Sequence, residues 1–310
     1  MNPMDKKNSF FVNSFIAMIL ITTALFAPAH ASENDNSDIE LIKNRGSLLV
    51  GITDFAPMDF KDDSGNWIGF DADLARIVAE DLGVDVEFVE INWDNKILEL
   101  NNKNIDCVWN GMTLTDEVKN SMDTTTAYCN NAQVVVLPAD IAEDYQDVES
   151  LKDLKFAVEA GSAGEAAARE HGFDYTSLTS QSDALLEVEA ATSDASIIDL
   201  LLVDSMIGDG TRYPHLTHTF ELTVEEYAVG CRKGSDLTAF INDELNALYE
   251  DGTLEEIAET YDVAAAVIAP GAIIERPESN TVNTAESSIP SASSLPETKP
   301  DPEFDFKKFK

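Results

Sequence analysis

The stretch WNGMTLTDEVK, residues 109–119, carries the most information about the fold and the function of this chain. It begins at the end of an apolar run that predicts a strand, and Asn110 and Gly111 end that strand. Thr115 and the two acids after it form the pattern of a helix N-cap. A flexible glycine, hydroxyls and free N–H groups at a helix start suit a carboxylate or another small polar group. An ordinary strand-to-helix turn has the same order, so the local chemistry leaves both interpretations open.

The segments before this stretch alternate between strand and helix patterns. Residues 48–53 predict a buried strand, and GFDADLARIVAEDLG, residues 69–83, has apolar residues at helical spacing and ends on a glycine. A half-exposed strand at 84–91, a short helix at 97–100 and a strand at 106–109 follow. The alternation predicts an α/β sheet with helical connections.

A second αβ series begins after a strand at 132–137. It comprises a first segment at 148–154, a strand at 155–159, helices at 163–171 and 181–191, and a strand at 195–199. Ser162 and Glu165 form a capping box, which presents a second helix N-terminus at the end of a strand. Two such sites facing each other could hold one small guest. A strand at 227–231 and two helices, starting at Ser235 and Thr253, complete the pattern.

The first 31 residues have the order of a secretory signal peptide. Two lysines precede an apolar run at 10–26, and Ala29, His30 and Ala31 form a small-x-small cleavage site. This predicts export to the periplasm or the cell exterior, with cleavage after Ala31. A membrane anchor is the alternative, although the run is short for a span and contains polar residues.

The C-terminal segment 271–310 differs in composition from the rest of the chain. From Glu275 it is rich in Pro, Ser, Thr, Asn and Glu, and it has hardly any large apolar residue before Phe304. Such a segment buries too little apolar surface to offset the entropy lost on ordering. We expect a disordered tail, either a solvated terminus or a segment that binds through its last aromatic residues.

The formal net charge of the chain is −38. The predicted signal peptide carries +1, so the exported chain would carry about −39. Such a surface repels phosphate, which argues against a nucleic-acid partner. The acidity increases solubility, and it is also consistent with a salty habitat or with attraction of cationic ligands.

The chain has three cysteines, Cys107, Cys129 and Cys231. An odd number in an exported protein allows at most one internal disulfide and leaves one thiol over. Their spacing matches no metal site, and no cofactor is predicted. The sequence does not indicate which pair, if any, is bonded.

Eight motifs in order resemble those of bacterial extracellular solute-binding proteins of the polar amino-acid class, family 3, the substrate-binding proteins of ABC transporters. The motifs are GITDFAPMDF, GFDADLA, Asn92-Trp93, NGMTLTDE, VEAGSAGEAA, SDASIID, EYAVGCRKGSDL and DGTLEEIAETY. The resemblance covers residues 39–263. It implies a two-lobed α/β fold of the periplasmic-binding-protein type II, with two hinge strands and a central ligand cleft that closes on its ligand.

The resemblance also implies where the lobes begin and end. Lobe 1 would be discontinuous, comprising residues 40–128 and 226–268, and lobe 2 would comprise residues 133–222. Residues 128–131 and 223–225 would be the hinges.

The ligand-contacting positions of the family fall on particular residues here. Phe55 and Trp93 would form aromatic walls, although either could be a core residue instead. The N–H of Gly111 and the hydroxyl of Thr113 would receive an α-carboxylate, unless the hydroxyl is bonded within its own turn. Asp199 would receive an α-ammonium group; its alternative role is a helix N-cap.

Two departures from the family pattern concern ligand identity. The family's carboxylate-binding arginine falls on Val118, which cannot donate a hydrogen bond or carry charge. The adjacent Lys119 would point about 100° away on a helix. Residues 124–126 are three threonines where the family has other residues, and they are either ligand contacts or a rewritten hinge.

Glu159 stands where many family members have a neutral or basic residue. With Asp54 and Asp199 it would make the cleft acidic, which favours a cationic guest and disfavours a free carboxylate. Alternatively, Glu159 points to solvent. The complete set of predicted ligand-contacting residues is Asp54, Phe55, Trp93, Asn110, Gly111, Thr113, Glu159, Ser162 and Asp199.

These observations predict a monomeric receptor that captures a small polar solute, an amino acid or a derivative, and delivers it to an ABC permease in the membrane. No catalysis, metal or cofactor is required. One alternative is an enzyme similar to cyclohexadienyl dehydratase on the same fold, although no histidine falls in a cleft motif. The other is a soluble sensory binding module.

Overall fold

The computed structural model describes residues 37–272 of the chain. The predicted signal peptide, its cleavage site after Ala31 and nearly all of the predicted tail lie outside these residues. Within the described range, no helix combines the length and the hydropathy needed to span a bilayer.

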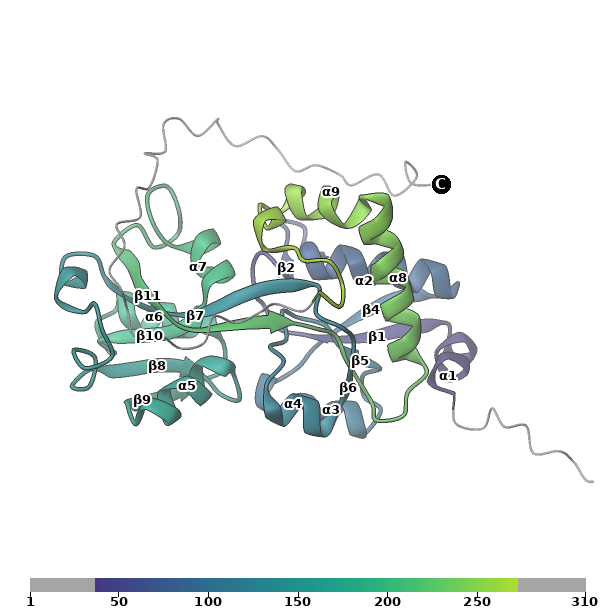
Figure 1. Ribbon diagram of the computed structural model, residues 1–310, viewed down its shortest axis with the longest axis horizontal. Helices are drawn as coiled ribbons and strands as arrows, with labels where there is room; N and C mark the ends of the chain where they lie inside the picture. Colours follow the sequence, from purple (N-terminus) through teal and green to yellow (C-terminus); the bar gives the residue numbers. More distant parts are fainter. Residues whose placement is uncertain (1–36, 273–310) are drawn as a thin grey trace, which may run out of the picture. The chain divides into compact units, whose positions relative to one another are not determined.

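The first sheet combines strands from two distant parts of the chain (Figure 1). Its order is β4 (Asp85–Glu90), β1 (Ser47–Ile52), β5 (Cys107–Val108), β12 (Gly230–Cys231) and β6 (Asp123–Thr124). β1 is parallel to β4 and β5, whereas β12 is antiparallel to β5 and β6. The late strand β12 therefore lies between β5 and β6, in a sheet whose other strands come from the first part of the chain.

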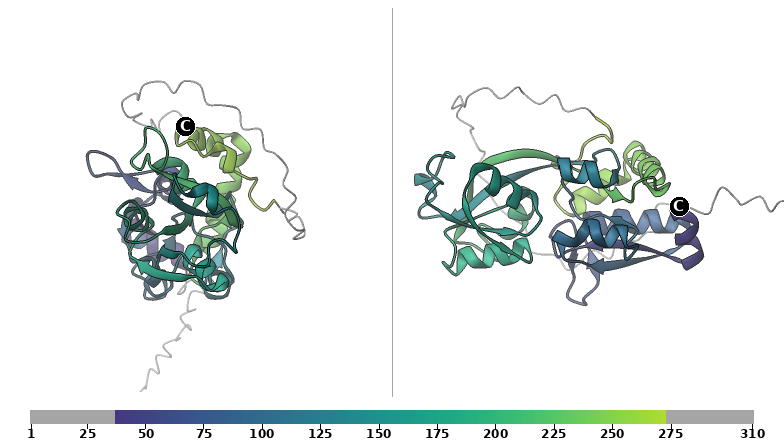
Figure 2. Two further views of the ribbon diagram at one scale, coloured as in Figure 1. Left: turned by 90° about the vertical axis from the view of Figure 1, so that its left-hand side faces the viewer. Right: turned by 90° about the horizontal axis from the view of Figure 1, so that it is seen from below.

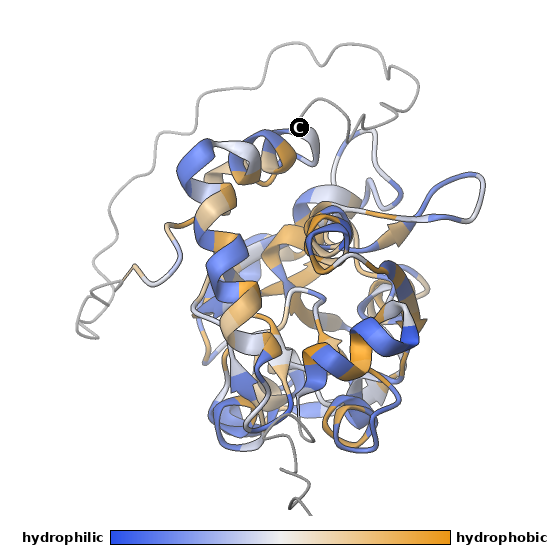
Figure 3. Ribbon diagram, turned by 90° about the vertical axis from the view of Figure 1, so that its right-hand side faces the viewer, coloured by the Kyte–Doolittle hydropathy of each residue, from blue (hydrophilic) through white to orange (hydrophobic). Residues whose placement is uncertain are grey.

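Six helices accompany this sheet: α1 (Asp38–Arg45), α2 (Phe70–Leu82), α3 (Lys96–Asn101), α4 (Asp116–Ser121), α8 (Leu237–Asp251) and α9 (Thr253–Thr260). The helices that face the viewer in Figure 3 carry both hydrophilic and hydrophobic segments, as expected for helices with one face on a core. Gly83, with a φ of 77°, ends α2 in the left-handed conformation that glycine adopts without strain.

The second sheet has the order β11 (Leu216–Tyr227), β7 (Cys129–Pro138), β10 (Ala195–Asp199), β8 (Lys155–Glu159) and β9 (Asp174–Leu178). It is accompanied by α5 (Ala163–His171), α6 (Gln181–Glu189) and α7 (Leu200–Met206). The small hairpin of β2 (Phe60–Lys61) and β3 (Trp67–Ile68) stands apart from both sheets. The long antiparallel strands β7 and β11 run from the second sheet to the first (Figures 1 and 2).

We propose that the two sheets form the two lobes and that β7 and β11 carry the hinges. The strands of the first sheet fall within the predicted ranges 40–128 and 226–268. Those of the second sheet fall within 133–222, except that β7 and β11 extend through the predicted hinge residues. The structure is consistent with these boundaries, which remain a proposal.

Most predicted elements are present, and the exceptions have physical reasons. The strands at 155–159 and 195–199 and the helix at 163–171 have the predicted bounds. The first segment of the second series, for which no element type was predicted, forms turns at 148–153. β9 was missed because its sequence, DYTSL, has little apolar character and its side chains are partly or fully exposed. The strand predicted at 227–231 is in fact the end of β11 and the separate β12.

The three cysteines are free thiols, and all are buried. Cys107 on β5 lies opposite Cys231 on β12. Burial raises the pKa of Cys231 to about 12 and the pKa values of Cys107 and Cys129 well above the ordinary range. All three are therefore neutral, poorly reactive side chains in the folded protein.

A buried arginine joins the two chain segments of the first sheet. Arg232 pairs with Asp38 (Nε to Oδ2, 3.0 Å) and with Asp106 (Nη2 to Oδ1, 3.2 Å), and its Nη1 donates to the carbonyl of Ile105 at 2.6 Å. Arg232→Met leaves two buried carboxylates without this partner, and we expect it to lower the free energy of unfolding by about 3 kcal/mol. Urea denaturation measures the loss. A decrease below about 1 kcal/mol would show that the ion pairs contribute little.

Candidate functional site

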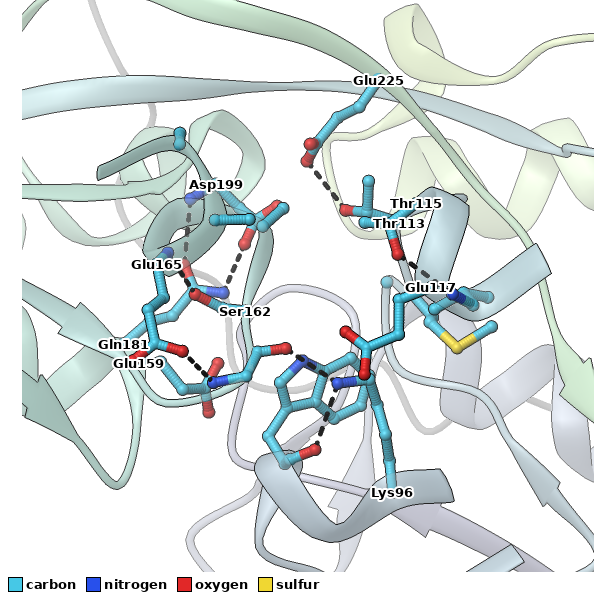
Figure 4. A pocket seen from close by; sticks show the side chains of 18 of the residues that line it. Lys96, Thr113, Thr115, Glu117, Glu159, Ser162, Glu165, Gln181, Asp199 and Glu225 are labelled. Atoms are coloured by element: carbon cyan, nitrogen blue, oxygen red, sulfur yellow. Dashed lines mark hydrogen bonds between the residues drawn. The ribbon is translucent and has the colours of Figure 1, made fainter. Parts of the chain in front are cut away.

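A cavity of about 560 Å³ lies between residues that follow strands of the first sheet and residues that follow strands of the second. Figure 4 shows side chains from both sides pointing toward it. Eight of the nine predicted contact residues line it: Phe55, Trp93, Asn110, Gly111, Thr113, Glu159, Ser162 and Asp199. The structure therefore brings together residues that lie as much as 144 positions apart in the sequence, from Phe55 to Asp199.

Asp54 is the predicted residue that the structure places elsewhere. It is exposed and does not line the cavity. Its neighbours Thr53 and Phe55 both line the cavity, and in an extended segment the side chain between two such residues points the opposite way. Asp54 therefore lies outside the wall of this cavity.

Asp199 ends β10 and is held by four side chains. Its Oδ1 accepts hydrogen bonds from Asn131 Nδ2 (2.5 Å), Gln133 Nε2 (2.9 Å) and the hydroxyl of Tyr227 (2.6 Å), and its Oδ2 accepts one from Gln181. The carboxylate does not cap α7, so the predicted N-cap alternative is wrong for the side chain. With one donor assigned among residues 37–272, Oδ2 retains capacity to accept a hydrogen bond from a ligand.

Glu225, on β11, is a site residue that the sequence analysis placed only in a hinge. Its Oε1 accepts hydrogen bonds from Asn131 Nδ2 (2.6 Å), Gln133 Nε2 (2.8 Å) and the Thr113 hydroxyl (3.0 Å). Removal from water, together with the nearby charge of Asp199, raises the pKa of Glu225 to about 8. The signal that could have found it is the two-residue period of a strand, since Thr223 also lines the cavity.

Glu159, at the end of β8, is buried with 3% of its surface exposed. The alternative that it points to solvent is therefore wrong. Its Oε1 has no hydrogen-bond partner within residues 37–272. Burial, reinforced by the charge of Asp199, raises the pKa of Glu159 to about 8. A buried acceptor without a partner at the wall of a cavity is a position for a hydrogen-bond donor of a ligand.

The two groups predicted to receive a ligand carboxylate are engaged by carboxyl groups of the protein itself. The N–H of Gly111 donates to Asp71 Oδ2 at 2.6 Å, and the Thr113 hydroxyl donates to Glu225 Oε1 at 3.0 Å. The side-chain amide of Asn110 donates to Asp59 Oδ2 at 2.8 Å. The donors predicted to bind a ligand carboxylate are therefore already bonded to carboxyl groups of the protein.

Val118 is 2% exposed and packs in an apolar cluster with Trp93, Met112 and Met122. The position of the family arginine is therefore an apolar wall. Lys119 is exposed and lies outside the cavity lining, so it does not replace the arginine.

Lys96 connects the two sides of the cavity. Its Nζ donates to the carbonyl of Gly161 across the cavity (2.8 Å) and to the carbonyl of Trp93 (3.3 Å). It also lies 4.8 Å from the centre of the Trp93 ring, so this aromatic wall already interacts with a cation of the protein. A Cβ on Gly161 would come within 2.7 Å of Asp94 Cα, which shows how closely the two sides approach.

Ser162 caps α5 as predicted, but Glu165 reaches back to the N–H of Gly161 and not to that of Ser162, so the capping box is only half formed. The N–H of Glu165 donates to Ser162 Oγ at 3.1 Å, and Glu165 Oε2 accepts from the N–H of Gly161 at 2.9 Å. These bonds fix Ser162 in the cavity wall (Figure 4).

The threonines at 124–126 do not line the cavity. Thr125 exchanges hydrogen bonds with the backbone of Val229, and Thr126 bonds to Asn242. These residues therefore lie outside the cavity wall, and the hydroxyls of Thr125 and Thr126 bond to Val229 and Asn242 instead.

The cavity lining is strongly acidic. It contains eight carboxyl side chains and two cationic ones. The acids are Asp94, Asp116, Glu117, Glu159, Glu165, Glu170, Asp199 and Glu225, and the cations are Lys96 and Arg169. Within the described part of the chain, no cluster of three or more His, Cys, Asp or Glu side chains is arranged to hold a metal ion.

Residues 48–263 match the family model of the bacterial extracellular solute-binding proteins, family 3. The chain belongs to this family. The match covers well over half of the sequence and includes both sheets and the whole cavity lining.

Among other members of family 3, the L-cystine-binding protein TcyJ of Escherichia coli (strain K12) is 27% identical over 231 residues, 73% of this chain and 86% of that protein. The P235GK mutant of ArgBP from T. maritima has a TM-score of 0.67 and 32% identity, covering 72% of this chain and 98% of that one. A truncated ArgBP from T. maritima (residues 20–233), solved with arginine bound, has a TM-score of 0.63 and 33% identity, covering 67% and 99%. The ancestral amino acid-binding protein AncCDT-1, a precursor of cyclohexadienyl dehydratase, has a TM-score of 0.67 and 32% identity, covering 73% and 99%.

Membership of family 3 confirms the predicted fold class and the predicted function. The chain is an extracellular solute-binding protein of the amino-acid ABC-transporter class with the two-lobed type II architecture. The relatives are mainly binding proteins, and one of them is a precursor of a dehydratase.

Proposed function

We propose that this protein captures a small solute that carries a positive charge, an amino acid or a close derivative, and delivers it to an ABC permease. The observation that carries the proposal is the unpartnered, buried Oε1 of Glu159 in a cavity that also contains Asp199 and Glu225. Carboxyl groups removed from water are costly unless a donor or a cation meets them. A cationic ligand supplies both.

In this proposal the lobes close around the ligand, and the exported protein, with its signal peptide removed after Ala31, acts as a monomer. The Lys96 to Gly161 hydrogen bond already joins the two sides of the cavity. Ligand contacts to both sides would add to this bond and shift the population toward the closed form, which the permease would recognise.

We propose no enzymatic activity for the cavity. Prephenate, the substrate to consider for an enzyme similar to cyclohexadienyl dehydratase, carries two carboxylates. Eight carboxyl groups line the cavity, and Lys96, its buried cation, is bonded to backbone carbonyls. Like charges in a partly dehydrated site oppose such binding. Incubation with prephenate should leave it unchanged, and its turnover by the purified protein would establish the enzyme instead.

A thermal-shift panel of cationic, neutral and acidic amino acids, with amines and small organic acids, tests the proposed function. Binding at a hundredfold excess over Kd adds about 2.7 kcal/mol to the free energy of unfolding, so a true ligand raises the melting temperature by several degrees. We expect shifts with cationic compounds only. Shifts confined to acidic or neutral compounds, or no shift with any compound, would contradict the proposal.

A further inference from the structure

We infer that the ligand of this cavity carries no free carboxylate, and that the site takes an organic cation of the amine or guanidine class instead of an α-amino acid. Glu225 is the residue that specifies this choice. The inference rests on the proposed function, because it assumes that the cavity binds a cationic solute.

The first argument is the engagement of the groups that would hold a carboxylate. The Thr113 hydroxyl donates to Glu225 and the Gly111 N–H donates to Asp71. A ligand carboxylate near Thr113 would have to displace Glu225 or lie beside it. Once Glu225 is ionised, the two carboxylates repel each other strongly because little water separates them.

The second argument is the lack of an available cation in the cavity. Val118 occupies the position of the family arginine. Arg169 is exposed near the end of α5, and Lys96 is bonded to two carbonyls and surrounded by the charges of four acids. Lys96 carries no paired donors, and the charge of the exposed Arg169 is screened by water, so neither replaces a buried arginine opposite Asp199.

The third argument is the distribution of acceptors. Glu159 Oε1, in the wall contributed by the second sheet, has no partner within residues 37–272. Asp199 Oδ2 retains capacity, and Glu225 adds a carboxyl group beside Asp199 (Figure 4). An ammonium group brings three donors and a guanidinium group brings five, and neither brings an acceptor. A carboxylate-free cation therefore satisfies this wall, whereas an amino acid also brings a carboxylate close to these acids.

Isothermal titration calorimetry with matched pairs tests the inference. The pairs are arginine with agmatine, lysine with cadaverine, and ornithine with putrescine, in which each amine differs from its amino acid by the carboxylate alone. We expect the amine to bind at least about tenfold more tightly in the pair that binds best, which is the effect of roughly one unfavourable charge contact. Equal or tighter binding of the amino acid in that pair would overturn the inference and leave the proposed function intact. If no compound of any pair binds, the proposed function fails as well.

Glu225→Gln provides a second, independent test. At pH 9, where Glu225 is ionised, glutamine can still accept the hydrogen bond from Thr113 but carries no charge, so the preference for the amine should fall by about tenfold. Glu221→Gln is the matched control, since it removes one exposed charge from the same strand outside the cavity. The Glu221→Gln variant should prefer the amine over the amino acid by the same factor as the wild type. Melting curves of both variants verify folding, and an unchanged preference in folded Glu225→Gln would show that Glu225 does not select against carboxylates.

Discussion

Exchange of Asp199 for asparagine should weaken the binding of a cationic ligand at least about 30-fold, because the loss of one partner of a desolvated charge pair costs about 2 kcal/mol or more. The side-chain shape is almost unchanged, yet the negative charge is removed. The amide would also present a donor to a site where Gln133, Gln181 and Tyr227 already donate. Calorimetric titration with the strongest cation of the thermal-shift panel measures the loss.

Asp209→Asn is the control for this substitution. Asp209 is exposed and lies outside the cavity lining, so the same chemical change there should leave the affinity as it is in the wild type. If the two variants bind equally well, Asp199 does not hold the ligand and the cavity described here is not the binding site.

Affinity for a cation should increase as the pH rises from about 6 to about 9, by as much as roughly tenfold per pH unit for each proton released. The pKa values of Glu159 and Glu225 are both raised to about 8, so both carboxyl groups are largely protonated below neutral pH. A cation favours their ionised forms. Binding therefore releases protons, and the affinity for the cation is higher at a pH where the two carboxyl groups are already ionised.

Titrations in buffers with different ionisation enthalpies measure the number of protons released. We expect release near neutral pH, and a smaller release in Glu159→Gln, which has lost one of the two groups. An affinity that does not change across this pH range, with no proton release, would show that neither carboxyl group ionises on binding.

The sequence predicted the parts of the fold that depend on local patterns. Apolar runs predicted β8 and β10, and the Ser162 and Glu165 pattern predicted the start of α5. The half-exposed strands β9 and β11 lack a clear apolar pattern because their side chains are only partly covered. Their positions depend on pairing with β8 and β7, which a local pattern does not contain.

In the site, too, some features could be predicted from sequence motifs, whereas others depend on contacts between distant residues. The family resemblance placed Asp199 and Trp93 in the cavity wall, and the structure agrees. The bond between Gly111 and Asp71 joins residues 40 positions apart, and the bond between Thr113 and Glu225 joins residues 112 positions apart. No local pattern indicates such contacts, and they change the predicted carboxylate site into an acidic one.

The structure explains what replaces the family's arginine at Val118. Val118 alone showed only that a carboxylate clamp is missing. Its burial beside Trp93 and Met112, together with the bond from Thr113 to Glu225, shows that a cavity of apolar walls and acids stands in its place. This combination supports binding of a cation more directly than the acidic composition of the whole chain.

The central claim, that this cavity selects a positive charge, is tested most directly by a pair of ligands that differ in charge and hardly in shape. Agmatine carries a guanidinium group, and N-carbamoylputrescine carries a neutral urea in its place; arginine and citrulline form the corresponding amino-acid pair. In calorimetric titrations the guanidinium compound of each pair that binds should bind at least about tenfold more tightly than its urea counterpart. Equal or tighter binding of the urea compounds would contradict the claim.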